Sequence, residues 1–460
     1  MQETHLRLGR QTVKLGLVKV VRELFPRDNL KTTYSILEGV FCNLTDSALS
    51  AREVDLIGVK LKEWVDKKSP IELIKKSEGY YHYKLDDSII KTVYPAHSNA
   101  SMVDPFTIVP YSYGFIVDFG DIGRGASRPL IPPDMLSQAF EKDRRWLKNI
   151  NIELVSDVNK YILAGKSMKL LSIAEALHEK EISDIADLVL NQRRALRVLL
   201  VSGPSSSGKT SFAQRISTQL EVNGFKPVPL SLDDYFLDRE KTPLNEKGEV
   251  DLECIGAIDL ELLNEHIISL IEGRKVETPI FDFVTGKRKP ETKPIQIGPS
   301  DILVIEGIHA LNPELITGIN RNLLYKVYVS ALGGLNIDLI NRIPTTEIRL
   351  IRRMVRDDLF RGAAPEETLK RWTNVRASEY ANIFLYQEEA DVMFNSSTIY
   401  ELNALRLFAE ESLQKIKKDG PYSETKERLL NLLSFFEPID TSKIPYNSIL
   451  REFIGNSIYF

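Results

Sequence analysis

The order of apolar and polar positions predicts a mixture of strands and helices in the first part of the chain. Residues 107–119 are aromatic and β-branched and are interrupted by Pro110 and Gly114, which predicts a strand, a turn and a second strand. In residues 50–68, leucine, isoleucine and valine recur three and four positions apart, as an amphipathic helix requires. Residues 156–194 repeat this helical spacing, and we expect a pair of connecting helices there.

Beyond these helices, apolar runs alternate with helical patterns. The run at 197–202 is continuously apolar, as expected of a strand that is buried on both faces of a parallel sheet. Further runs at 227–231, 301–306 and 324–329 predict three more strands. Because strands that alternate with helices form parallel sheets covered on both faces, the pattern indicates a doubly wound α/β domain.

These differences in pattern predict a chain of four parts. They are a smaller α+β domain over 1–155, a helical connector over 156–194, a doubly wound, mainly parallel α/β domain over 195–415, and a helical extension with a tail over 416–460. A chain of 460 residues is long enough for two or three domains with cores of their own.

Composition and charge narrow the class of protein. Sixty Lys and Arg residues against 64 Asp and Glu residues leave a net charge of −4, so we do not expect nucleic acid to bind through bulk positive charge. Cys42 and Cys254 are too few for a disulfide framework, which fits a reducing cytosol. Because no apolar stretch reaches about 18 residues, we expect a soluble cytoplasmic protein that does not span a membrane.

The segment Gly203-Pro-Ser-Ser-Ser-Gly-Lys-Thr210 matches the pattern G-x-x-x-x-G-K-[ST] and lies between a predicted strand and a predicted helix. In such a loop the backbone N–H groups surround phosphates, Lys209 reaches the β and γ phosphates, and the Thr210 hydroxyl binds Mg²⁺. A chance Gly/Ser-rich turn is the alternative, but the strand before it and the helix after it favour a phosphate site. The residues expected to bind nucleotide are Gly203, Ser205, Ser206, Ser207, Gly208, Lys209, Thr210 and Ser211.

Two groups of acidic residues follow predicted strands. Asp233 and Asp234 come after the strand at 227–231, and Glu306 ends the strand at 301–306. Because parallel strands end at one edge of a sheet, these carboxylates should emerge beside the phosphate-binding loop. There a carboxylate can accept a proton from an attacking hydroxyl and help to hold Mg²⁺. A solvated turn or a cap is the alternative for each group.

A third candidate is the arginine-rich segment 349–361. Its arginines recur at helical spacing, so that several share one face. They are Arg349, Arg352, Arg353 and Arg356, followed by Arg361 before a glycine. A helix that carries guanidinium groups over a bound nucleotide would stabilise charge on a transferred phosphoryl group. The alternative is a solvated basic helix that pairs with Glu347, Asp357 and Asp358.

Together these residues resemble the uridine kinase and phosphoribulokinase group of P-loop kinases over about residues 195–400. The blocks occur in the family's order and include 203–210, 231–236, 279–288, 305–308, 349–362 and 390–394. The resemblance implies a P-loop kinase fold that binds ATP and Mg²⁺ and phosphorylates a hydroxyl of a small molecule, and it is compatible with a homo-oligomer. Asp233 matches the family's catalytic base, Lys209 belongs to the catalytic set, and Thr210, Asp233 and Glu306 match magnesium neighbours. Arg353, Arg356 and Arg361 match arginines of a helical lid.

The chain departs from the uridine kinase pattern around the acceptor. Glu253 stands where the family places a ribose-gripping aspartate, and Gly286 stands where it places a base-reading histidine. Phe281 and Phe283 can still stack on a ring, while Arg371 replaces a glutamine. The residues expected to bind substrate are Asp234, Tyr235, Glu253, Phe281, Phe283 and Arg371. A site without the histidine should discriminate bases weakly or recognise something other than a pyrimidine.

A narrower resemblance concerns the first part of the chain. The chain is similar to bacterial nucleoside kinases in which a threonyl-tRNA-synthetase-like region precedes the kinase domain. The segments concerned are 34–40, 114–119, 173–178, 336–346 and 447–455. The resemblance implies a relative of the synthetase editing domain, but the His-x-x-x-His pair of that domain is missing. His82 and His97 are fifteen residues apart and Cys42 stands alone, so we expect no hydrolytic metal site. Segment 336–346 either shapes the acceptor pocket or is a structural loop.

Three functions follow from the sequence. The first is an ATP-dependent kinase that phosphorylates a nucleoside, most directly at its 5′-hydroxyl. The second keeps this chemistry with a non-nucleoside acceptor such as a sugar or polyol, and the third is a nucleotide-dependent regulator associated with RNA. The sequence does not fix the acceptor, the preferred phosphate donor, the oligomeric state or the role of the synthetase-like region.

Overall fold

The computed structural model describes residues 2–36, 39–120, 133–192, 196–244, 248, 250–282 and 285–460. The chain forms two compact units, each built from separate stretches of sequence. The N-terminal unit consists of Met1–Ser167, Gly333–Glu347 and Ile416–Ile439, and the P-loop unit consists of Met168–Leu332, Ile348–Lys415 and Asp440–Phe460. The four-part division expected from the sequence stays a prediction.

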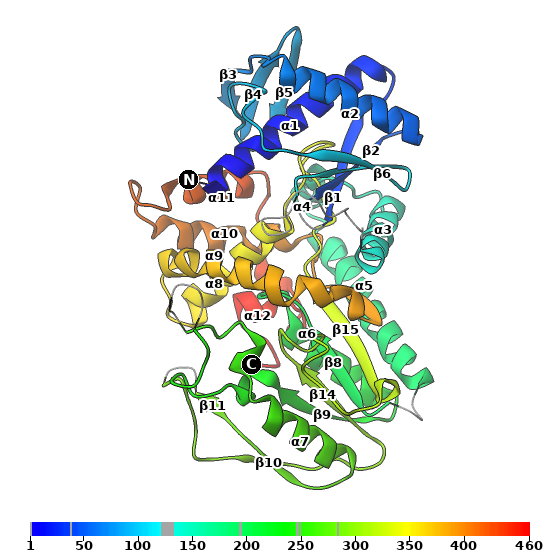
Figure 1. Ribbon diagram of the computed structural model, residues 1–460, viewed down its shortest axis with the longest axis vertical. Coiled ribbons are helices and arrows are strands. Elements are labelled where there is room, and N and C mark those ends of the chain that lie inside the picture. Colours follow the sequence, from blue (N-terminus) through cyan, green and yellow to red (C-terminus); the bar gives the residue numbers. More distant parts are fainter. Residues whose placement is uncertain are drawn as a thin grey trace. The chain divides into compact units, whose positions relative to one another are not determined.

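The P-loop unit is built on a five-stranded sheet in which every neighbouring pair is parallel. Its strands are β8 (Val198–Ser202), β9 (Lys226–Ser231), β14 (Asp301–Glu306), β15 (Leu324–Ser330) and β16 (Val392–Asn395), in the order β16-β15-β8-β14-β9. Figure 1 shows β15, β8, β14 and β9 side by side, with α6 beside them. All residues of the central strand β8 are buried, as the continuous apolar run predicts. The expected mainly parallel α/β fold is therefore confirmed.

Helices and two short antiparallel strand pairs complete the P-loop unit. The α-helices are α5 (Ser167–Asn191), α6 (Lys209–Val222), α7 (Leu260–Ile271), α8 (Thr345–Phe360), α9 (Pro365–Asn382), α10 (Glu401–Gln414) and α12 (Arg451–Ile454). The 3-10 helices are η1 (Leu232–Tyr235), η2 (Ile255–Ala257), η3 (Arg321–Leu323), η4 (Phe384–Glu389) and η5 (Thr441–Lys443). Two antiparallel pairs join β10 (Val276–Thr278) to β13 (Lys293–Ile295) and β11 (Phe281–Asp282) to β12 (Lys287–Arg288). Neither antiparallel pair was predicted from the sequence.

The N-terminal unit contains two antiparallel sheets. One has the order β1 (Leu30–Ile36), β2 (Gly39–Leu44), β7 (Gly114–Asp118) and β6 (Thr107–Tyr111), and the other joins β3 (Glu72–Ser77), β4 (Tyr80–Leu85) and β5 (Ser88–Thr92). Its helices are α1 (Gln2–Leu24), α2 (Ala51–Asp66), α3 (Asp134–Asn149), α4 (Val155–Leu163) and α11 (Ser423–Leu433). The strand, turn and strand predicted over 107–119 are confirmed by β6 and β7. Helices α4 and α5 cover most of 156–194, and a helical connector there stays a prediction.

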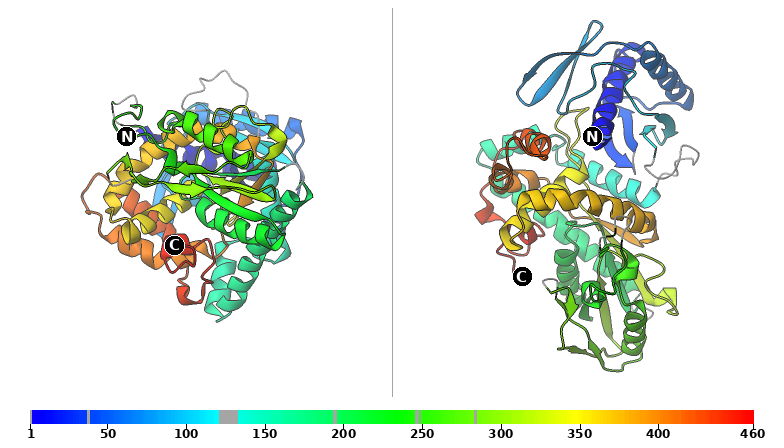
Figure 2. Two further views of the ribbon diagram at one scale, coloured as in Figure 1. Left: turned by 90° about the horizontal axis from the view of Figure 1, so that it is seen from below. Right: turned by 60° about the vertical axis from the view of Figure 1, so that its left-hand side comes forward.

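Helices α1 and α2 pack directly on each other in this unit. Ser50 accepts a hydrogen bond from the Glu53 N–H and Glu53 bonds back to the Ser50 N–H, so this capping box starts α2 one residue inside the predicted helix. A Cβ on Gly16 would lie 2.4 Å from the Trp64 ring, so only glycine allows α1 to approach α2 this closely. Figure 2 shows the two helices side by side. Helix α1 was not predicted from the sequence, although Val13, Leu15 and their apolar neighbours are buried.

Segment Gly333–Glu347 belongs to the N-terminal unit, where hydrogen bonds hold it. The Asn336 side chain donates to the Thr32 carbonyl over 2.7 Å. Asn341 accepts from the Lys14 ammonium over 2.9 Å and from the Val93 N–H over 3.2 Å. Of the two interpretations of 336–346, these contacts favour the structural loop.

In the part of the chain that the structure describes, no helix combines the length and the apolar character that crossing a bilayer requires.

Candidate active site

The predicted phosphate-binding loop connects the central strand β8 to helix α6. A Cβ on Gly203 would lie 2.0 Å from the Val329 carbonyl oxygen, and one on Gly208, whose φ is +84°, would lie 2.6 Å from Ile449. Both positions therefore require glycine. Helix α6 begins at Lys209, so the N–H groups of its first turn have no carbonyl of the preceding turn to bind and can receive an anion.

The Lys209 and Thr210 side chains face acidic groups and the loop itself. The Lys209 ammonium donates to the Pro204 carbonyl over 3.2 Å, and the Thr210 hydroxyl donates to a Glu306 carboxylate oxygen over 3.5 Å. Burial lowers the pKa of Lys209 below its ordinary value, while the negative charges of Glu306 and Asp233 oppose this shift. Side chains of the types that bind a metal–triphosphate complex therefore lie near one another: a lysine (Lys209), a hydroxyl (Thr210) and a carboxylate (Glu306).

Asp233 and Glu306 come from neighbouring strands at the same edge of the sheet. Glu306 is paired with Ser231 at the end of β9 and with Val201 of β8, and Asp233 follows β9 in η1. Burial raises the pKa of Glu306 to about 7, and the negative charge of Asp233 contributes to this rise. Asp233 is exposed to solvent. Desolvation by the surrounding protein nevertheless raises its pKa, and the positive charge of Lys209 opposes this rise. Two neighbouring carboxylates repel each other when both are ionised, so this pair favours a bound proton or a bound cation.

Two arginines of α8 hold the loop from outside. The Arg349 guanidinium donates to the Ser205 carbonyl over 2.9 Å and pairs with Glu379. Arg352 donates to the Ser206 carbonyl over 3.3 Å and pairs with Glu401. Both arginine side chains are only 1% exposed.

The burial of Arg349 and Arg352 decides against one interpretation of the arginine segment. For Arg349 and Arg352, the solvated basic helix is wrong, because their charges are matched inside the protein by acids of α9 and α10. No sequence pattern predicts this role, because the two partners lie 30 and 49 residues farther along the chain.

The three arginines predicted to form a lid differ in their surroundings. Arg353 donates to the Ser205 hydroxyl over 2.7 Å. Arg356 pairs with Asp357 over 3.2 Å, whereas Arg361 is 59% exposed and lies 3.7 Å from Asp357. Asp357 thus balances positive charge on this side of the loop. Among the hydrogen bonds of the described residues, Arg353 is the one of the three arginines that contacts the loop directly.

One acid at this site was not predicted from the sequence. Glu452, on the short helix α12, accepts a hydrogen bond from the Ser211 hydroxyl over 2.7 Å and lies 3.6 Å from Arg356. Only the resemblance of segment 447–455 to related kinases pointed to this part of the chain, and it assigned no role to the glutamate.

The predicted acceptor residues are only partly accessible. Glu253 is half-buried, and burial raises its pKa to about 7, opposed chiefly by Arg353. Asp234 accepts the Phe281 N–H over 3.3 Å, which fixes β11 beside η1. Arg371 is exposed and pairs with Glu367 on the same helix, and Phe283 lies outside the described residues. Their roles in substrate binding stay predictions.

Two aromatic residues of the predicted acceptor set lie in the core. Tyr235 is fully buried, and its hydroxyl is hydrogen-bonded to His266 over 2.9 Å. Phe281 is 7% exposed and packs edge-on against Phe236, with ring centroids 5.6 Å apart. Because these groups already have partners inside the protein, we do not include either residue in the proposed acceptor site.

The position that lacks the base-reading histidine has a backbone conformation that favours glycine. Gly286 has a φ of +70°, and a Cβ there would lie 2.6 Å from the Arg239 guanidinium, which would have to move. The Arg239 N–H also donates to the Gly286 carbonyl over 2.9 Å. The backbone of the loop therefore favours glycine at this position.

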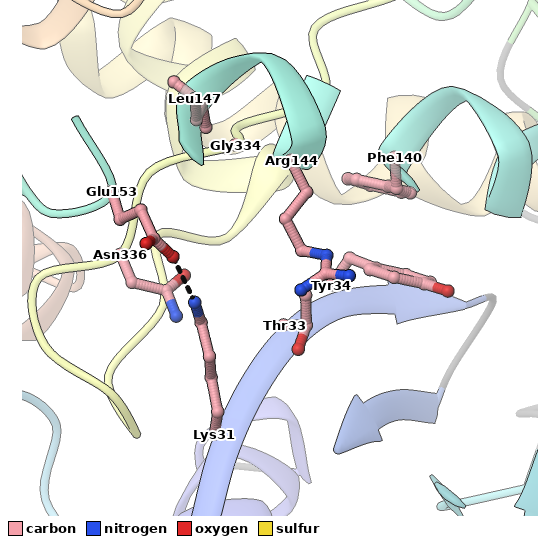
Figure 3. Close-up of a pocket in the computed structure, with 9 residues that line it drawn as sticks. All are labelled: Lys31, Thr33, Tyr34, Phe140, Arg144, Leu147, Glu153, Gly334 and Asn336. Atoms are coloured by element: carbon pink, nitrogen blue, oxygen red, sulfur yellow. Dashed lines mark hydrogen bonds and ion pairs between the residues drawn. The ribbon is translucent and has the colours of Figure 1, made fainter. Parts of the chain in front are cut away.

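Figure 3 shows a small pocket within the N-terminal unit. Its lining residues are Lys31, Thr33, Tyr34, Phe140, Arg144, Leu147, Glu153, Gly334 and Asn336. Tyr34 stacks on Phe140 at 4.6 Å, and Lys31 donates to Glu153 over 2.7 Å. With a cavity volume of about 20 Å³, the pocket has room for about one water molecule. It is too small for the substrate of a kinase.

Comparison with known proteins identifies the family. The family described as "Phosphoribulokinase / Uridine kinase family" matches residues 198–402. A uridine kinase of Brevibacillus brevis is 31% identical over 176 residues, which cover 38% of this chain and 72% of that protein. A uridine kinase of Halalkalibacterium halodurans is 31% identical and is covered over 75% of its length, with 39% of this chain. The chain belongs to the phosphoribulokinase and uridine kinase family.

Membership of the phosphoribulokinase and uridine kinase family makes this protein an ATP-dependent kinase, a transferase that acts on small molecules. Because the family match covers residues 198–402, the likeness of the N-terminal region to a synthetase editing domain stays a prediction.

Two solved kinase structures are similar to part of the chain. A possible uridine kinase from Bacillus stearothermophilus shares 18% identity, covers 47% of this chain and 100% of its own, and gives a TM-score of 0.31. D-glycerate 3-kinase from Cryptococcus neoformans shares 16% identity, covers 46% of this chain and 89% of its own, and gives a TM-score of 0.33.

The buried pair of Arg352 and Glu401 leads to a prediction about stability. Glu401→Gln keeps the shape of the side chain but leaves the Arg352 charge unbalanced in the core. We expect the free energy of unfolding to fall by about 3–5 kcal/mol, measured by urea denaturation. Glu411→Gln, at an exposed position on the same helix, should change it little. Equal stability of the two variants would contradict the role of the buried pair.

Proposed function

We propose that this kinase transfers the γ-phosphoryl group of ATP to a hydroxyl of a nucleoside, most directly the 5′-hydroxyl. The observation that carries the proposal is the meeting of Asp233, Glu306 and Lys209 at one edge of the sheet, beside the phosphate-binding loop and the first turn of α6. The similarity to proteins named uridine kinase supports a nucleoside as the acceptor.

The donor site would hold ATP through the loop and Lys209. For Mg²⁺, the Thr210 hydroxyl and the Glu306 and Asp233 carboxylates supply the oxygen ligands that this ion prefers. In the described residues, no three His, Cys, Asp or Glu side chains form a metal-binding group, so water and phosphate oxygens would complete the coordination. When bound, the ion would offset negative charge on the β and γ phosphates.

Transfer itself requires a base near the acceptor. Asp233 would accept the hydroxyl proton as the acceptor oxygen forms its bond to the γ phosphorus and the bond from that phosphorus to the leaving oxygen of ADP breaks. Lys209 and Arg353 would stabilise the charge that spreads over the transferred group, because both lie against the loop.

The acceptor site would be built around Glu253. The charges of Arg353, Lys209 and Asp233 act on its carboxylate. The carboxylate therefore lies near the groups that are proposed to carry out phosphoryl transfer. A carboxylate at this place can accept hydrogen bonds from neighbouring hydroxyls of a sugar ring. This role requires the ionised form of Glu253.

A second candidate acceptor is a sugar or polyol without a base. It is favoured by the packing of Gly286 against Arg239, which leaves no side chain there to read the edge of a base. A site that cannot hydrogen-bond a base loses the main source of discrimination between nucleosides and simple alcohols.

An acceptor panel tests the proposal. Purified protein with ATP and Mg²⁺ would be given ribonucleosides, deoxyribonucleosides, sugars and polyols, and ADP release would be measured. We expect nucleosides to stimulate ADP release most, with little preference among bases. Stimulation by a sugar or polyol alone would replace the nucleoside with the second candidate.

The base role of Asp233 predicts a separation of binding from catalysis. Asp233→Asn keeps the size of the side chain but cannot accept the proton, so kcat should fall by about 10²–10⁴-fold while the Kd for ADP changes little. Asp184→Asn, at an exposed position on α5, serves as the control. Undiminished turnover in Asp233→Asn would remove this residue from the mechanism.

The raised pKa of Glu253 predicts a pH dependence of acceptor binding. With a pKa of about 7, the carboxyl is neutral in mild acid and ionised in mild base. The acceptor KM should therefore fall about tenfold as the pH rises from about 6 to about 8. In Glu253→Gln this dependence should disappear and the KM should stay high. Because Glu306 has a similar pKa, an unchanged profile in that variant would assign the titration to Glu306 and contradict the role of Glu253.

A further inference from the structure

A carboxylate of the chain itself lies on the phosphate-binding end of α6. Besides the hydroxyl bond of 2.7 Å, a Glu452 carboxylate oxygen accepts the backbone N–H of Ser211 over 3.4 Å. The Phe212 N–H is the next one along the helix and already donates to the Gly208 carbonyl. The Ser211 N–H is thus one of the first-turn groups that can bind an anion, and Glu452 already accepts its hydrogen bond.

The same carboxylate group faces several charges of the nucleotide site. One of its oxygens lies 3.6 Å from Arg356, and its charge acts on Lys209 and Glu306. A phosphate that approaches this end of α6 would meet a group of its own sign. It would also find the Ser211 N–H already engaged.

Well-defined contacts fix the segment that delivers Glu452. The Ser448 hydroxyl donates to Glu175 over 2.6 Å, and Arg451 donates to the Ile444 carbonyl over 2.6 Å. The Arg352 guanidinium lies 4.9 Å from the centre of the Phe453 ring, and Ile449 packs against Gly208. Glu452 therefore reaches the loop from a folded segment within the P-loop unit.

We propose that Glu452 is an intramolecular competitor of the nucleotide phosphates and so sets the affinity of this kinase for nucleotide. One N–H cannot donate a full hydrogen bond to both a carboxylate and a phosphate, and two anions at one helix N-terminus repel each other. Nucleotide entry then requires Glu452 to release Ser211. The inference rests on the placement of the phosphates on the loop in the proposed function.

The affinity for nucleotide distinguishes a Glu452 that competes with the phosphates from a Glu452 that supports the loop. Glu452→Gln keeps the length of the side chain and removes its charge. If the carboxylate leaves the site only about a tenth of the time, the Kd for ADP, measured by calorimetry on the full chain, should fall about tenfold. Glu411→Gln, which removes the same charge from an exposed position, should leave the Kd unchanged. An unchanged or higher Kd in Glu452→Gln would overturn the proposal, because it would mean that Glu452 braces Ser211 for the nucleotide.

Hydrogen exchange on the unmodified protein provides a second test. If ADP displaces Glu452, the backbone amides of residues 448–455 should exchange faster with ADP than without it. Slower exchange in this segment would contradict displacement. Neither measurement uses an acceptor, so a failure of the nucleoside assignment in the acceptor panel leaves both results interpretable, and a failure here leaves that assignment standing.

Discussion

The nucleotide site depends on two arginines that are buried behind the phosphate-binding loop. A loop that turns its N–H groups toward an anion must turn carbonyl groups away from it, and these need donors of their own. Arg349 and Arg352 supply them at Ser205 and Ser206. Their charges are tolerable inside the protein because Glu379 and Glu401 balance them. The shape of the loop is therefore maintained by ion pairs between helices as well as by its glycines.

Several acids act on one lysine at the site. The charges of Glu306, Asp233 and Glu452 all act on Lys209. Burial is the main cause that raises the pKa of Glu306, and the negative charge of Asp233 adds to it. Such a site is suited to bind a positively charged metal together with a nucleotide, since the metal offsets the repulsion that the acids create.

The sequence predicted the strands and the loop because their signals are local. A continuous apolar run, a glycine-rich turn and a helical pattern follow one another between residues 197 and 222. The roles of Arg349 and Arg352 could not be predicted, because their partners lie on other helices. A sequence does not distinguish an aromatic side chain that faces a substrate from one that is buried in the core, as Tyr235 and Phe281 are. Glu452 lies 241 residues from Ser211, and no pattern connects them.

The packing of Ile449 and Phe453 around the loop has a consequence for how the protein is made. A ribosome adds residues in order, and early parts of a chain can begin to fold before later parts exist. The loop at 203–210 emerges about 240 residues before the segment that contacts Gly208 and Arg352. Until that segment has emerged, the nascent nucleotide site lacks one of its walls, so its final form is reached late in synthesis.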